Sequence, residues 1–207
     1  MTTVIGTYLF TVLLFLILPG PVNLAVVDHA ARGGWKGALL AVFGSNLASL
    51  VLILAAGLML DGLGRIHESL LDALAAAGGL YLLYYGGRLW HSRHDLPAAE
   101  SVPAARGHGA KIVASTFIIG ISNPKDVVFF MTFFPPFIVR LGWDLWPGLL
   151  LLTALWCLLD YAVLLAYGMG AAKIITPARA RTVHTACAAL FILIGLYAFG
   201  SGIGRFI

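Results

Sequence analysis

Long stretches without a charged side chain constrain this sequence more than any other feature. No Lys, Arg, Asp, Glu or His occurs from Met1 to Val27, and none occurs over the 24 residues from Gly37 to Leu60. A helix that crosses a lipid bilayer needs about 20 apolar residues, so each stretch predicts a transmembrane helix. The first stretch lacks the basic start and the cleavage pattern of a signal peptide, and we expect it to be retained.

The composition indicates an integral membrane protein. Of the 207 residues, 60% are hydrophobic and 11% are charged, whereas a soluble domain has about 45–50% apolar and about 25% charged residues. A globule of this size cannot hide so much apolar surface from water, so the surplus must face lipid. This excludes a soluble enzyme, a nucleic-acid binder and a disulfide scaffold. Cys157 and Cys187 lie singly in apolar runs and are expected to be packing residues.

The apolar runs predict an all-α membrane protein with six transmembrane helices in a single domain. The predicted helices are Met1–Val27, Gly37–Leu60, Leu70–Trp90, Lys111–Val139, Trp146–Ala172 and Thr182–Gly204. The fourth is interrupted by Lys125-Asp126, with 13 uncharged residues on each side, and only the two parts together are long enough to cross. The polar stretch His91–Ala110 is a predicted linker, which divides residues 1–207 into two halves of three helices, 1–90 and 111–207.

The distribution of Lys and Arg predicts the orientation of these helices. The connections after the first, third and fifth helices hold nine of these residues, whereas the opposite side holds three, Arg65, Arg140 and Arg205. Basic residues concentrate on the cytoplasmic side of a membrane protein. We therefore expect both termini outside and the linker His91–Ala110 in the cytoplasm.

Because three is odd, a second copy of the first half would be inserted upside down, as in the inverted repeats of many secondary transporters. Pro21-Val22-Asn23 and Pro124-Lys125-Asp126 occupy matching places in the two halves, 103 residues apart. Proline removes a helix hydrogen bond and clashes with the preceding turn, so the first and fourth helices should be broken there. One isolated proline would indicate a packing kink, but two matching breaks point to a transport site.

Each predicted break creates the N-terminus of a new helix. Such a terminus carries unpaired N–H groups and the positive end of the helix dipole, and it binds a carboxylate or another small anion. An asparagine amide adjoins each break. The substrate-binding candidates at the breaks are Pro19, Gly20, Pro21, Asn23, Asn123 and Pro124.

Three charged side chains, Lys125, Asp126 and Asp160, lie at predicted membrane depth. An ionised group there costs about 2.5–3.5 kcal/mol, so a compensating partner is needed. We expect Lys125 to pair with Asp160, with Asp126 as the competing partner. Such a pair could serve only to fix helix packing. Alternatively, two acids against one base leave a carboxylate for a cation or a proton, with Lys125 and Asp160 as substrate-binding and Asp126 and Asp160 as proton-coupling candidates.

At these residues the chain resembles the lysine-exporter (LysE/RhtB-type) amino-acid efflux translocators over essentially its whole length. It departs from the family's usual pattern at Val22, which separates Pro21 from Asn23, and at Pro136, where glutamine is common. The motifs that carry the resemblance are Leu18-Pro19-Gly20-Pro21, Ser122-Asn123-Pro124-Lys125, Phe129-Phe130, Phe134-Pro135-Pro136-Phe137, Tyr81–Gly87 and Asp160-Tyr161.

The resemblance implies proton-driven export of amino acids or close derivatives from a bacterial inner membrane, without a cofactor. The expected partners are the amino acid, protons and the lipid bilayer, and a homodimer stays open because Gly200 and Gly204 are spaced for close helix contact. The helix N-termini and Lys125 would bind the substrate carboxylate. Asp160 would bind the ammonium group or carry the exchanged proton.

Two alternatives to an amino-acid exporter remain. Transport of another small solute or a metal ion is the first, although the acids, Cys and His within the predicted helices are sparse for a metal site. His91 and His94 have a chelating spacing but lie in the polar linker. A membrane-embedded enzyme is the second, and the sequence has no HExxH, GxSxG or CxxC motif that would favour it.

Overall fold

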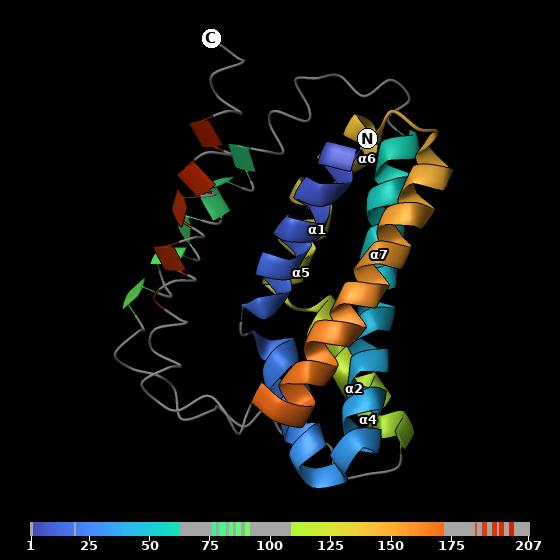
Figure 1. The fold of residues 1–207 in the computed structure, drawn as a ribbon, viewed down its shortest axis with the longest axis vertical. Coiled ribbons are helices and arrows are strands. Elements are labelled where there is room, and N and C mark those ends of the chain that lie inside the picture. The colour runs from blue at the N-terminus through green and yellow to red at the C-terminus, as the bar shows by residue number, and fades with distance from the viewer. Residues whose placement is uncertain are drawn as a thin grey trace.

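The computed structural model describes residues 2–18, 20–62 and 109–171, together with separate helical positions within 76–91 and 185–200. Every element in this part of the chain is a helix. The elements are α1 (Thr2–Ile17), α2 (Pro21–Gly62), α4 (Gly109–Ile121), α5 (Pro124–Val128), the π-helical turn η1 (Phe129–Phe133), α6 (Phe134–Leu141), α7 (Leu145–Ala166) and the π-helical turn η2 (Tyr167–Ala171) (Figure 1).

The first predicted transmembrane helix is broken, as its prolines predict. Helix α1 ends at Ile17 and α2 begins at Pro21, with Gly20 before it. The Leu24 N–H donates to the Gly20 carbonyl at 3.1 Å, so Gly20 is the N-cap and Pro21 the first helical residue. Proline is favoured at that position because it has no N–H to leave unpaired and its φ is already helical.

Helix α2 itself contains a sharp turn at Gly34, where φ is 60° and ψ is −149°. Only glycine adopts this backbone conformation without strain. The turn separates residues 21–33 from residues 35–62, and the second part contains the predicted transmembrane helix Gly37–Leu60. The second half of the broken helix therefore leads directly into the next long helix.

The fourth predicted transmembrane helix is also broken. Helix α4 ends at Ile121, α5 begins at Pro124, and the chain bends by 58° between them. The break lies where Pro124 predicts it, and Lys125 and Asp126, which interrupt the uncharged run, belong to the first turn of the new helix. The helical path then continues through η1 and α6 to Gly142, whose left-handed conformation (φ 68°) ends it.

The described residues contain two helices that are long and apolar enough to cross a membrane, Pro21–Gly62 and Leu145–Gly170, and a third candidate if the bent pair of α4 and Lys125–Leu141 counts as one span. Helix α7 together with η2 matches the fifth predicted helix. The predicted helices Leu70–Trp90 and Thr182–Gly204 and the linker His91–Ala110 lie largely outside the described residues. The linker ends earlier than predicted, because α4 begins at Gly109.

Glycines bring the third and sixth predicted helices into close contact. A Cβ atom added to Gly79 would lie 2.5 Å from the Phe199 nitrogen, and one added to Gly86 would lie 3.1 Å from the Ala188 carbonyl oxygen. The described positions of both stretches are helical and run side by side in Figure 1. These two glycines therefore serve the close helix packing that small residues permit in membranes.

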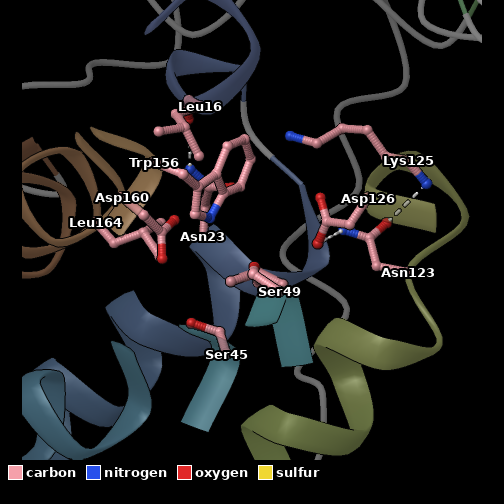
Figure 2. Close-up of a pocket in the computed structure, with 11 residues that line it drawn as sticks. Leu16, Asn23, Ser45, Ser49, Asn123, Lys125, Asp126, Trp156, Asp160 and Leu164 are labelled. Atoms are coloured by element: carbon pink, nitrogen blue, oxygen red, sulfur yellow. Dashed lines mark hydrogen bonds between the residues drawn. The ribbon is translucent and has the colours of Figure 1, made fainter. Parts of the chain in front are cut away.

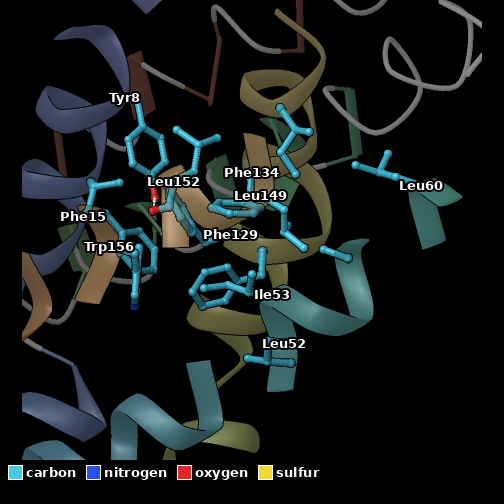
Figure 3. Packing of buried hydrophobic residues seen from close by; sticks show 14 of the residues in the cluster. Tyr8, Phe15, Leu52, Ile53, Leu60, Phe129, Phe134, Leu149, Leu152 and Trp156 are labelled. Atoms are coloured by element: carbon cyan, nitrogen blue, oxygen red, sulfur yellow. Dashed lines mark hydrogen bonds between the residues drawn. The ribbon is translucent and has the colours of Figure 1, made fainter. Parts of the chain in front are cut away.

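The core of the described part lies between α1, α2, α6 and α7 and is rich in aromatic rings (Figure 3). The Tyr8 hydroxyl is buried within it and donates to the Leu152 carbonyl at 2.8 Å. On α7 the side chains of Leu152 and Trp156 are buried, whereas Leu150 and Leu158 are 70% and 68% exposed. The apolar surplus of the sequence thus lies on the outer surface, where a membrane protein meets lipid.

Candidate functional site

The two broken helices meet at a small polar cavity enclosed by α2 and α7 (Figure 2). Its volume is about 10 Å³, roughly what a single water molecule requires. The site is therefore closed in this conformation, and a larger molecule can enter only if the helices move apart. The lining residues are Leu16, Val22, Asn23, Ser45, Ser49, Asn123, Lys125, Asp126, Trp156, Asp160 and Leu164.

Asn23 joins the two helices on either side of the first break. Its Oδ1 accepts a hydrogen bond from the Gly20 N–H at 3.2 Å, and its Nδ2 donates to the Leu16 carbonyl at 3.1 Å. One buried amide thus satisfies a donor at the start of α2 and an acceptor at the end of α1. The break is held in a defined geometry rather than left as unpaired backbone, which would be costly at membrane depth.

Lys125 reaches from the first turn of α5 to the end of α1. Its Nζ donates to the carbonyls of Phe15 and Leu18 at 3.1 and 3.2 Å and lies 4.3 Å from the centre of the Phe15 ring. The last carbonyls of a helix lack partners within it and form the negative end of its dipole, which favours a cation. A broken helix thus offers the ammonium group backbone oxygens as partners, and the expected pairing of Lys125 with Asp160 stays a prediction.

A third side chain completes the capping of α1. The Tyr167 hydroxyl, at the start of η2, donates to the Ile17 carbonyl. Together with the bonds made by Asn23 and Lys125, this gives each of the four carbonyls of residues 15–18 a side-chain donor. The end of α1 is therefore connected to α2, α5 and η2 at once.

Asp160 lies on α7 and is 3% exposed. Its Oδ2 accepts a hydrogen bond from Asn46 Nδ2 at 3.0 Å, and Asn46 Oδ1 accepts one from the Cys157 thiol at 3.4 Å. A neutral amide from α2 thus positions this carboxylate at the cavity. Asn46 was not predicted as a site residue, because it lies in a long uncharged run and 114 residues from its partner.

Asp126 is the second buried carboxylate of the cavity. Its Oδ2 accepts from Asn123 Nδ2 at 2.9 Å, while Asn123 Oδ1 accepts from the Lys125 backbone N–H at 3.2 Å and caps α5. An acid in the first turn of a helix is stabilised by the positive end of the dipole. Asp126 is therefore bound to the second break, whereas Asp160 approaches the cavity from a separate helix.

This arrangement gives the cavity a specific chemistry. A carboxylate has about four sites for hydrogen bonds, so Asp126 and Asp160 can each accept more than the amide donor seen here. A buried carboxylate also needs a positive partner, which a proton or a bound cation supplies. The cavity can thus bind a proton, a cationic group, or each in turn.

Most of the predicted site residues come together here. Asn23, Asn123, Lys125, Asp126 and Asp160 line the cavity directly. The remaining candidates were Pro19, Gly20, Pro21 and Pro124. Gly20 lies next to the cavity, since a Cβ atom there would be 3.4 Å from the Lys125 nitrogen. Pro21 and Pro124 begin the helices after the breaks, and Pro19 lies outside the described residues.

Sequence reasoning missed the serines and the tryptophan of the cavity. Ser45 and Ser49 are spaced by one helical turn in the uncharged run Gly37–Leu60, and Trp156 is one turn from Asp160 on α7. Residues four apart lie on the same face of a helix. The four-residue spacing from Asp160 could have predicted that Trp156 faces the site. The same spacing also occurs between residues that only pack in a helix core.

A helical membrane protein with two broken helices around a buried polar cavity has the construction of a small-solute transporter. The chain belongs to the LysE type translocator family, whose model matches residues 13–202. The members of this family are transporters and not enzymes. No solved structure shows a significant match to the chain.

Among curated proteins, the chain is similar to a leucine efflux protein of Salmonella typhimurium, with 27% identity over 132 residues. That match covers 64% of this chain and 62% of the relative's length. An uncharacterized membrane protein of Vibrio cholerae is 25% identical over 167 residues, which cover 81% of this chain and 80% of that protein. Another, from Pseudomonas aeruginosa, is 30% identical over 136 residues, or 64% and 62% of the two chains.

Proposed function

We propose that this protein exports amino acids or close derivatives from the cytoplasm in exchange for protons. The observation that carries the proposal is the closed polar cavity, where the carboxylates of Asp126 and Asp160 lie beside the ends of two broken helices. An amino-acid zwitterion presents a cation and an anion, and the cavity offers groups suited to both. Membership of a translocator family and similarity to a leucine efflux protein support this substrate class.

The proposed architecture is six transmembrane helices in two inverted halves, in a bacterial inner membrane with both termini outside. Matching backbone caps at the two breaks support the repeat. Leu24 N–H donates to the Gly20 carbonyl and Val127 N–H donates to the Asn123 carbonyl, and the second bond is the first displaced by 103 residues. Inverted repeats allow alternating access by rocking one half against the other around a fixed site.

In the proposed substrate complex, the carboxylate lies at the N-terminal end of α2, beside Gly20, Pro21 and Asn23. The ammonium group lies against Asp160. Lys125 adds positive charge next to the carboxylate while its bonds to the end of α1 hold it in place. Asn123 and Pro124 shape the second break, and Asp126 is a second proton-binding group.

Exchange follows from one carboxylate serving two ligands in turn. With the site open to the cytoplasm, ionised Asp160 binds the substrate's ammonium group. With the site open to the outside, the substrate leaves and a proton takes its place on the carboxylate. The neutral acid then returns to the cytoplasmic side and releases the proton, so that one proton enters for each substrate exported through this group.

The experiment that tests the proposal is uptake of a panel of labelled amino acids into everted membrane vesicles, with and without an interior-acid proton gradient. An exporter accumulates its substrate inside such vesicles, and we expect gradient-dependent accumulation of at least some members. Asp160→Asn is the matched variant, because it keeps the shape and the Asn46 contact but cannot exchange a proton. Wild-type uptake by this variant, or no uptake of any amino acid by the folded wild type, would refute the proposal.

A further inference from the structure

One hydrogen-bond donor at the cavity has no partner among the residues that the structure describes. It is the indole Nε1–H of Trp156, whose side chain is 1% exposed. An indole nitrogen can only donate, and buried polar groups in proteins are almost always hydrogen-bonded. An unpaired buried donor at a polar cavity therefore needs an explanation, and an acceptor brought by a ligand provides one.

The surrounding rings fix the orientation of this donor. Trp156 packs edge-on against Phe130, with ring centres 4.5 Å apart, and its ring centre lies 5.2 Å from that of Phe129 and 6.0 Å from that of Phe15. Its nitrogen end is directed away from this aromatic cluster (Figure 3). In Figure 2 the indole lies between the side chains of Asp160 and Asp126, with which it lines the cavity. The indole N–H therefore has a fixed position at the cavity.

The position of Trp156 on α7 relates it to Asp160. The two residues are four apart, so they lie on one helix face with Cβ atoms about 5–6 Å apart. One turn of α7 therefore presents a neutral donor beside a carboxylate. A complementary ligand carries a hydrogen-bond acceptor and a cation within a few bonds of each other. The carboxylate and ammonium groups of an α-amino acid, which share one carbon atom, satisfy that requirement.

We infer that Trp156 is a substrate-binding residue whose indole N–H donates a hydrogen bond to the α-carboxylate of the transported amino acid, while Asp160 binds the α-ammonium group. The inference rests on the proposed function and adds which chemical groups of the substrate the site recognises. Trp156 and Asp160, one turn apart on α7, bind the α-carboxylate and α-ammonium groups that all α-amino acids share. Compounds that keep the amine but lack the free carboxylate should bind poorly, whatever their side chain.

The test compares the purified wild type, Trp156→Phe and Trp146→Phe, each reconstituted in lipid vesicles with an imposed proton gradient. Phenylalanine keeps an aromatic ring but removes the N–H. Trp146 is the matched control, because it lies on the same helix, is 42% exposed and is not at the cavity. The measurements are the half-saturating concentration of a transported amino acid, the inhibition of its uptake by its α-carboxamide, and the melting temperature.

We expect Trp156→Phe to raise the half-saturating concentration about 10- to 100-fold, the usual effect of losing a hydrogen bond to a charged group. The wild type should be inhibited much less by the carboxamide than by the free amino acid, and this difference should shrink in the variant. Trp146→Phe should behave as the wild type. A merely structural tryptophan would lower the melting temperature without changing the ratio of the two inhibitors.

The outcomes separate this inference from the proposed function. If the wild type transports amino acids and Trp156→Phe retains the wild-type half-saturation and inhibitor ratio, the inference fails and the proposed function stands. If the folded wild type transports no amino acid, both fail. Should Trp156→Phe not fold, a variant with Phe at positions 35, 90, 143 and 146 keeps Trp156 as its single tryptophan. Its indole ¹⁵N–¹H resonance must then shift when substrate is added, and an unchanged resonance would overturn the inference.

Discussion

The two helix breaks have the same backbone design and different side chains. Gly20 and Asn123 are the N-caps, a proline follows each, and the first backbone bonds of the new helices match at a spacing of 103 residues. The third helical residue, however, is neutral Asn23 at the first break and acidic Asp126 at the second. The first break thus has no charge of its own, whereas the second carries an acid and a lysine.

This difference shows how the two breaks depend on each other. The first break exposes the carbonyls at the end of α1, and the second supplies the ammonium group of Lys125 that binds Phe15 and Leu18. Asn23 spans the first break within its own half, whereas Asn123 holds Asp126 within the second. The charge at one break therefore stabilises the backbone at the other, so we expect substitutions to have unequal effects at the two.

The largest loss of stability should follow Lys125→Met, which keeps the length of the side chain but removes its charge. The Phe15 and Leu18 carbonyls would lose their donor and Asp126 a neighbouring cation, at a cost of about 3–5 kcal/mol. Denaturant titration in detergent micelles measures this free energy of unfolding. The control is Lys111→Met, because Lys111 is exposed on α4. This variant should change the free energy of unfolding by less than about 0.5 kcal/mol. Equal effects would show that the two breaks are independent.

Asn23→Ala should be the next most destabilising change. It leaves the Gly20 N–H and the Leu16 carbonyl without their partner, and two unpaired buried groups cost about 2–4 kcal/mol. Asn23→Asp keeps the acceptor for Gly20 but loses the donor to Leu16 and adds a buried carboxylate, so it should not restore the stability that the alanine variant loses. If the alanine variant is as stable as the wild type, the amide does not hold the first break together.

Asn123→Ala removes the N-cap of α5, which contributes about 1–2 kcal/mol, and also the amide donor to Asp126. The helix dipole still stabilises the Asp126 carboxylate and the α1 carbonyls keep their donors, so we expect the total loss to stay below that of Asn23→Ala. Asn123→Ser is the matched variant, since a serine hydroxyl also caps helices and should restore the contribution of the cap but not that of the bond to Asp126. A loss larger than that of Asn23→Ala would reverse the order expected from the comparison of the breaks. Both variants can be followed by denaturant titration.

The smallest effect is expected for Gly20→Ala. Gly20 is not among the glycines with positive φ, which in the described residues are Gly34 and Gly142, and its added Cβ atom would make an ordinary 3.4 Å contact with the Lys125 nitrogen. The melting temperature should hardly change. Gly44→Ala is the contrasting control, because its Cβ atom would lie 2.2 Å from Thr116 Oγ1 and force α2 and α4 apart. A large loss for Gly20→Ala would mean that the first break needs glycine itself.

Much of this molecule could be predicted from its sequence, because local physics determines it. Charge-free runs predict the long helices, and prolines predict both breaks. Both signals are local, because apolar length and the loss of a helix hydrogen bond at proline depend on neighbouring residues alone. The partners of the buried charges could not be predicted in the same way. Lys125 binds backbone carbonyls, which every residue has, and Asp160 binds Asn46 across 114 residues of sequence. Such contacts depend on how the helices pack, which no short motif encodes.

If Asp160 exchanges a proton for substrate, the arrival of substrate must release protons, and this release can be measured. Everted vesicles with an acidic interior are monitored with a pH-sensitive dye while a transported amino acid is added outside. Wild-type protein should let protons leave as the substrate enters, and Asp160→Asn should abolish this response at an unchanged level of folded protein. Substrate uptake without proton movement, or a full response from the variant, would show that Asp160 does not exchange a proton for substrate.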